Sequence, residues 1–66
     1  MNIVLNGEAR SLAASSSVAD LVQSLGYAGK RVAVERNGEI VPRSTYPQAF
    51  IADGDRIEIV VAVGGG

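Results

Sequence analysis

The chemistry available to this chain is concentrated in its last three residues, Gly64, Gly65 and Gly66, which directly follow an apolar segment. The sequence contains no cysteine and no histidine, so it offers no thiol nucleophile, no imidazole base and no thiolate or imidazole metal ligand. Catalytic sets of the Ser-His-Asp and Cys-His kinds are therefore excluded. The candidate reactive group is the terminal carboxylate of Gly66.

Three consecutive glycines suit a carboxylate that must reach into a narrow site. They have no Cβ atoms, so they can enter a slot that a side chain would block, and they permit backbone angles that other residues avoid. Fully extended, they reach at most about 10 Å. A carboxylate is a poor electrophile, so we expect a partner enzyme to activate it with ATP as an acyl-adenylate. The alternative interpretation is an inert, frayed chain end.

The composition excludes several classes of partner. The net charge is -1 and the six basic residues are scattered, so we expect no nucleic-acid partner. The longest apolar run, Ile59–Val63, is too short to span a bilayer, and Met1–Val4 lacks the features of a signal peptide. We therefore expect a cytoplasmic protein without a membrane partner. A chain of 66 residues predicts a single small domain.

The first half of the chain predicts two strands and a helix. In Met1–Asn6 every second residue (Met1, Ile3, Leu5) is apolar and lies on one face, which is typical of a strand. An Asn-Gly pair, typical of a tight hairpin, precedes a return strand over Glu8–Leu12. Ser17 and Asp20 have the spacing of a helix N-cap with an acid in the first turn. Apolar residues then recur at helical spacing over Val18–Leu25.

The second half predicts three further strands. Gly26 suits the end of the helix. Strands are expected over Arg31–Arg36, after which a second Asn-Gly pair turns the chain, over Glu39–Val41, and over Arg56–Val63. Segment 43–52 is irregular by pattern, with a helical turn near its start. Three side chains of that segment are expected to anchor it to the core: Tyr46, Phe50 and Ile51.

The element order strand-strand-helix-strand-strand-strand predicts an α+β fold. It matches a ubiquitin-like β-grasp, with a mixed sheet of four to five strands and one main helix packed on one face. In such a fold, the last strand lies centrally beside the first. We expect a β-grasp domain over residues 1–63 and a flexible glycine tail over residues 64–66.

Alternation along the last strand separates two faces. Ile57, Ile59, Val61 and Val63 form one face, which we expect to pack on the helix. The other face is then uncovered and carries three residues: Glu58, Val60 and Ala62. This second set is a candidate docking patch beside the tail. The alternative is an ordinary scatter of exposed small apolar residues.

The acidic residues are weaker candidates. Asp53 and Asp55 flank a glycine, a pattern typical of a turn, and we favour turn chemistry over a metal site there. We therefore predict no metal site. The acids could instead serve as rim charges for a basic partner: Asp20, Glu35, Glu39, Asp53, Asp55 and Glu58.

Three segments carry a resemblance to a known family. Asn37–Ser44 (NGEIVPRS), Asp53–Val60 (DGDRIEIV) and Ala62–Gly66 (AVGGG) resemble the ThiS family, the sulfur carrier proteins of thiamin (thiazole) biosynthesis. The specificity of the resemblance lies in the three segments occurring in the correct order, and the similarity extends over the whole chain.

The resemblance implies a β-grasp carrier that has no active site of its own and binds no cofactor. By this resemblance, an E1-like adenylyltransferase uses ATP to adenylate Gly66, and a sulfur-donating enzyme supplies the sulfur that converts it to a thiocarboxylate. Thiazole synthase then takes that sulfur. Gly65 corresponds to the second glycine of the family motif and Gly64 extends the arm, so all three are expected to enter partner active sites.

Three alternatives remain at this stage. The small subunit of molybdopterin synthase resembles this chain in fold and tail chemistry, although those chains tend to be longer. A ubiquitin-like protein modifier would be joined through Gly66 to lysines of its targets. A plain β-grasp interaction module would carry an inert tail.

Overall fold

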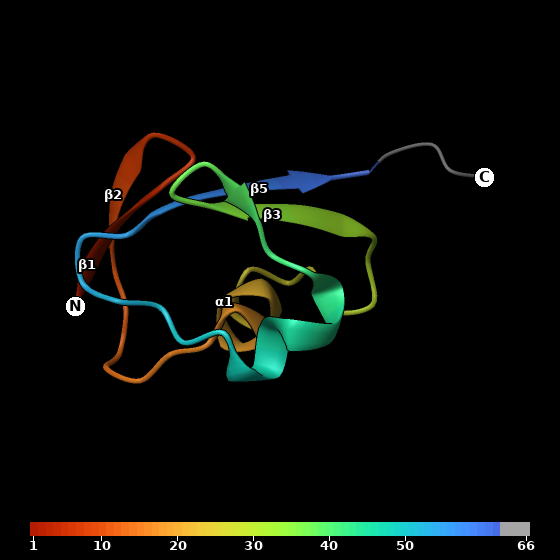
Figure 1. Ribbon diagram of the computed structural model, residues 1–66, viewed down its shortest axis with the longest axis horizontal. Helices are drawn as coiled ribbons and strands as arrows, with labels where there is room; N and C mark the ends of the chain where they lie inside the picture. Colours follow the sequence, from red (N-terminus) through yellow and green to blue (C-terminus); the bar gives the residue numbers. More distant parts are fainter. Residues whose placement is uncertain (63–66) are drawn as a thin grey trace.

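The computed structural model describes residues 1–62 of the chain. The predicted order of elements is confirmed (Figure 1). The last strand ends two residues earlier than predicted, at Val61, while Val63 and the glycines lie outside the described residues. The elements are β1 (Asn2–Leu5), β2 (Glu8–Ser11), α1 (Val18–Ser24), β3 (Val32–Arg36), β4 (Glu39–Ile40), the 3-10 helix η1 (Arg43–Gln48) and β5 (Arg56–Val61).

The strands form one mixed sheet in the order β2-β1-β5-β3-β4. β5 lies at the centre beside β1, as predicted for a β-grasp. It is parallel to β1 and antiparallel to β3. The two edge pairs, β1 with β2 and β3 with β4, are antiparallel. Figure 1 shows α1 and η1 on the same side of the sheet. The described chain therefore covers one face of the sheet and leaves the other open.

Both Asn-Gly pairs form the hairpin turns that the sequence predicts. Asn6 and Gly7 have φ values of 50° and 83°, and Asn37 and Gly38 have values of 51° and 87°. A two-residue hairpin of this kind needs positive φ at both positions, which asparagine and glycine tolerate best. These turns determine the register of the two edge hairpins.

Helix α1 is capped at both ends by local sequence. Ser17 Oγ accepts a hydrogen bond from the Asp20 N–H at 3.0 Å, and Asp20 Oδ2 accepts one from the Ser17 N–H at 2.9 Å. This reciprocal pair is a capping box. At the other end, the Tyr27 N–H donates to the Val22 carbonyl and the Gly26 N–H to the Gln23 carbonyl. The helix therefore ends in a Schellman motif, with Gly26 at a φ of 79°.

The hydrophobic core fills the space between the sheet and the two helices. β1, α1, β3 and β5 each contribute buried apolar side chains, because residues of one parity in each strand and one stripe of the helix face inward. The buried apolar residues are Ile3, Leu5, Val18, Leu21, Val22, Val34, Tyr46, Ile51, Ile57 and Ile59.

One predicted core anchor is wrong. Tyr46 and Ile51 are buried, as expected, but Phe50 is 58% exposed. Phe50 forms an isolated antiparallel bridge with Ser17, and the Ile51 N–H donates to the Ser16 carbonyl at 2.9 Å. Neighbouring residues of an extended backbone point to opposite sides. Because Ile51 points into the core, Phe50 points out to solvent.

Candidate functional site: the open face of the sheet

The burial pattern of β5 confirms the predicted division of its two faces. Ile57 and Ile59 are buried beneath the helix layer, and Val61 is half-buried. Glu58, Val60 and Ala62 are exposed, and Val60 is 65% exposed. The uncovered residues of β5 therefore lie near the end of the described chain. Their role in docking stays a prediction.

The neighbouring strands extend this surface further than the sequence predicted. Ala33 of β3 lies directly opposite Val60, and Ile40 of β4 lies opposite Glu35. Directly opposed residues share a face of the sheet, so Ala33 and Ile40 belong to the same face as Val60. Ile40 is 67% exposed. The open-face patch, as we call it below, consists of Ala33, Ile40, Val60 and Ala62.

A local signal for Ile40 was present in the sequence. The Asn37-Gly38 turn places Glu39 opposite Arg36 and Ile40 opposite Glu35. A two-residue loop determines this register by itself. The pairing of Ala33 with Val60 joins residues far apart in the chain and has no comparable local signal.

Two carboxylates lie within the same surface. Glu58 of β5 is directly opposite Glu35 of β3, with Val60 and Ala33 forming the next pair along the strands. Arg36 faces the other side, where its Nε donates to Asp55 Oδ2 at 2.8 Å. Within residues 1–62, neither Glu35 nor Glu58 has an ion pair or a side-chain hydrogen bond. The open face therefore presents apolar side chains together with an acidic pair.

The proposal of Asp55 as an exposed rim charge is wrong. Its side chain is buried and accepts hydrogen bonds from the Ala52 N–H at 2.8 Å, Arg36 Nε at 2.8 Å and Asn37 Nδ2 at 3.1 Å. Burial by itself raises the pKa of this carboxyl. The bond from Ala52, the bond from Asn37 and the Arg36 cation outweigh it, and the pKa lies below the ordinary value of 3.8.

The Asp55 network holds the beginning of β5 in place. Asn37 also accepts a hydrogen bond from the Arg56 N–H at 2.9 Å, which ties the β3–β4 turn to the strand. The other acid of the turn, Asp53, accepts from the Asn2 N–H at 2.6 Å. Both aspartates thus have turn roles, and in the described part of the chain no three acidic side chains gather in a way that could hold a metal ion.

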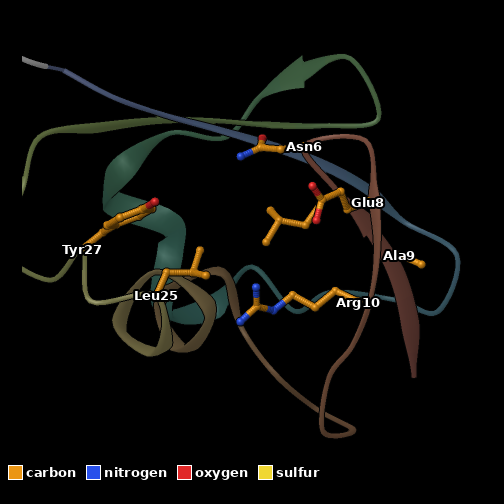
Figure 2. A pocket seen from close by; sticks show the side chains of 7 residues that line it. Asn6, Glu8, Ala9, Arg10, Leu25 and Tyr27 are labelled. Atoms are coloured by element: carbon orange, nitrogen blue, oxygen red, sulfur yellow. The ribbon is translucent and has the colours of Figure 1, made fainter.

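A shallow hollow lies on the opposite, helix-covered side of the sheet. It has a volume of about 230 Å³ and lies between the β1–β2 hairpin and the end of α1. Figure 2 shows Glu8 and Arg10 reaching into it from β2, Leu25 and Tyr27 facing them, and Ala9 pointing away. Because it is on the other face of the sheet, this hollow is separate from the open-face patch.

Comparisons with known proteins show which family this chain belongs to. The family model described as "ThiS family" matches residues 3–66, which includes the terminal glycines. The chain belongs to the ThiS family. It is 33% identical to the sulfur carrier protein ThiS of Escherichia coli over 66 residues, which is the full length of both. The crystal structure of the thiamine biosynthesis protein ThiS from Geobacter metallireducens has a TM-score of 0.83 and 35% identity, with all of both chains covered.

Another family relative is much longer than this chain. Over all 66 residues the chain is 52% identical to a thiazole synthase of Paramagnetospirillum magneticum, but it spans only 20% of that protein. A ThiS-like segment thus forms part of some thiazole synthases. The solved ThiS structure confirms the predicted β-grasp. No helix within residues 1–62 is long and apolar enough to cross a membrane.

Proposed function

We propose that this chain is a sulfur carrier for the thiazole branch of thiamin biosynthesis and acts as a cosubstrate of partner enzymes. The observation that carries the proposal is the match of the ThiS family model through residue 66, on a chain that contains neither cysteine nor histidine. Such a chain cannot hold sulfur as a persulfide. The carboxyl carbon of Gly66 is then the attachment point.

The proposed loading reaction has two steps. In the first, a carboxylate oxygen of Gly66 attacks the α-phosphorus of ATP in the active site of an E1-like adenylyltransferase, and pyrophosphate leaves. In the second, a sulfur nucleophile at the oxidation level of sulfide, supplied by a donor enzyme, attacks the acyl carbon and AMP leaves. The product is a thiocarboxylate. Thiazole synthase would then take up this sulfur and release the carrier.

The β-grasp domain would contribute by positioning. Under this proposal Gly64, Gly65 and Gly66 enter the partner's active site, while Glu58, Val60 and Ala62 contact the partner's surface. β5 is held between β1 and β3, so its exposed residues have a defined position relative to the end of the strand. Fixing the reactive group relative to a docking surface is how binding accelerates a reaction in a partner's site.

Reconstitution tests the proposal. The chain is incubated with ATP, the E1-like adenylyltransferase and a sulfur donor, and the product is then given to thiazole synthase. We expect one oxygen of the carrier to be exchanged for sulfur, and the exchange to be reversed as thiazole synthase turns over. A carrier that is loaded but discharged only by a molybdopterin synthase large subunit would contradict the thiazole assignment. Attachment to lysines of other proteins would instead indicate a modifier.

A further inference from the structure

We propose that the partner of the open-face patch inserts a lysine or arginine side chain between Glu35 and Glu58. This inference rests on the proposed function, and it adds the chemistry of the surface that recognises the carrier. The partner surface would be apolar where it covers Val60 and basic where it meets the two carboxylates.

The acidic pair is uncompensated within the described chain. Glu35 and Glu58 are directly opposed on neighbouring strands, an arrangement that destabilises a sheet when the charges are alike. Arg36 is directed to Asp55 on the other face. Arg56 lies on the open face two residues before Glu58, but no ion pair joins them within residues 1–62. A cation from outside the fold would relieve the repulsion.

The surroundings of the pair favour a long basic side chain. Ala33 and Val60 form the next cross-strand pair. Ile40 of β4 lies on the same face, opposite Glu35. The methylene groups of lysine or arginine pack on such apolar surface while the charged end meets carboxylates. Covering the patch also removes water from around the glutamates, which strengthens their attraction to a cation.

The same charges oppose a second copy of this chain as the occupant. A two-fold contact places the same surface of both subunits together. Self-association through the open-face patch would therefore bring Glu35 and Glu58 of each copy toward the same acidic pair of the other. A partner protein with a basic, partly apolar surface is complementary to this face.

The test measures ATP–pyrophosphate exchange by the E1-like adenylyltransferase as a function of carrier concentration. The variants are Glu35→Gln, Glu58→Gln and the double substitution. We expect each single substitution to raise the KM for the carrier about fivefold and the double more, with kcat retained, because an exposed charge governs association more than chemistry. The midpoint of thermal unfolding should stay equal or rise, since like-charge repulsion is removed.

Salt dependence and a matched variant make the test specific. The KM of the natural sequence should rise with ionic strength, and that of the double variant should respond less. Glu8→Gln removes the same charge on the helix-covered side of the sheet, beside the hollow in Figure 2, and should leave the KM unchanged.

Several results would overturn the inference. An unchanged KM in the double variant, or an equal rise in Glu8→Gln, would overturn it and leave the carrier function standing. Absence of exchange with the natural sequence would overturn the proposed function as well. A concentration-dependent dimer that Val60→Asp dissociates would assign the face to a second copy of the chain.

Discussion

The side-chain amide of Asn6 hydrogen-bonds to both backbone groups of Ile59. Asn6 Oδ1 accepts from the Ile59 N–H at 2.9 Å, and Asn6 Nδ2 donates to the Ile59 carbonyl at 3.3 Å. Just before this point, the Asn6 N–H donates to the Ile57 carbonyl in the parallel ladder between β1 and β5. The chain then turns away at Gly7. The amide thus continues the ladder by one step and holds the central strand where β1 has ended.

We predict that the Asn6 amide contributes measurably to stability. Asn6→Gly keeps the positive φ but loses the amide, and should lower the free energy of unfolding by about 1 kcal/mol. Asn6→Ala should cost about 1 kcal/mol more, because alanine is disfavoured at positive φ. Chemical denaturation measures both. Faster hydrogen exchange at the Ile59 amide should accompany the loss, and an Asn6→Gly variant as stable as the natural sequence would refute the prediction.

The Asp55 network predicts how stability depends on pH. The pKa of the Asp55 carboxyl is lowered in the folded state from its ordinary value of 3.8. Ionised Asp55 therefore stabilises the fold at a pH above that ordinary value, and this contribution is lost as the pH falls through the lowered pKa. Asp55→Asn should cost about 2 kcal/mol near neutral pH. The difference from the natural sequence should shrink below about pH 4.

Denaturation curves at several pH values measure this difference. Glu39→Gln, which alters an exposed carboxylate on β4, is the matched control and should stay within about 0.5 kcal/mol of the natural sequence. A cost of Asp55→Asn that is constant from neutral to acidic pH would show that the charge of Asp55 is not the stabilising feature.

Val60→Asp should weaken partner binding much more than it weakens folding. Val60 is 65% exposed, so the free energy of unfolding should change by no more than about 0.5 kcal/mol. An added carboxylate within the open-face patch should raise the KM of the adenylyltransferase for the carrier about tenfold or more. Phe50→Asp adds the same charge at another exposed apolar residue, beside Ser17 on the helix layer, and should leave the KM unchanged. An unfolded Val60→Asp protein would contradict the assignment of the open face.

Removal of Gly66 should separate folding from function. The buried core residues named above all lie between Ile3 and Ile59, so we expect the midpoint of thermal unfolding to be preserved. Loading with sulfur should be lost, because the carboxylate would end one residue short of its position in the partner's site. Loss of a large part of the thermal stability would show that Gly66 has a structural role instead.

Local sequence signals predicted much of this fold. The Asn6-Gly7 and Asn37-Gly38 turns and the cap formed by Ser17 and Asp20 each involve residues within a few positions of one another. The structure confirms all three. Such features could be predicted because turn and cap chemistry depends on few neighbours. The uncovered face of β5 could also be predicted, since alternation along one strand is a local property.

Long-range contacts account for what the sequence did not predict. The local sequence predicts that Asp55 is an exposed acid in a turn. Its hydrogen-bond partners Arg36 and Asn37 lie 19 and 18 residues earlier. The Asn6 amide reaches a residue 53 positions away. The opposition of Glu35 and Glu58 depends on the pairing of β3 with β5, which only the assembled sheet determines. Phe50 was misassigned because the burial of Ile51 decides the direction of its neighbour.

The proposed function requires that sulfur is carried on the carboxyl carbon of Gly66. Tandem mass spectrometry of the chain after incubation with ATP, the adenylyltransferase and a sulfur donor tests it most directly. We expect one oxygen to be replaced by sulfur and the fragments to locate the replacement at Gly66. An unmodified Gly66, under conditions that load the Escherichia coli sulfur carrier protein ThiS, would contradict it.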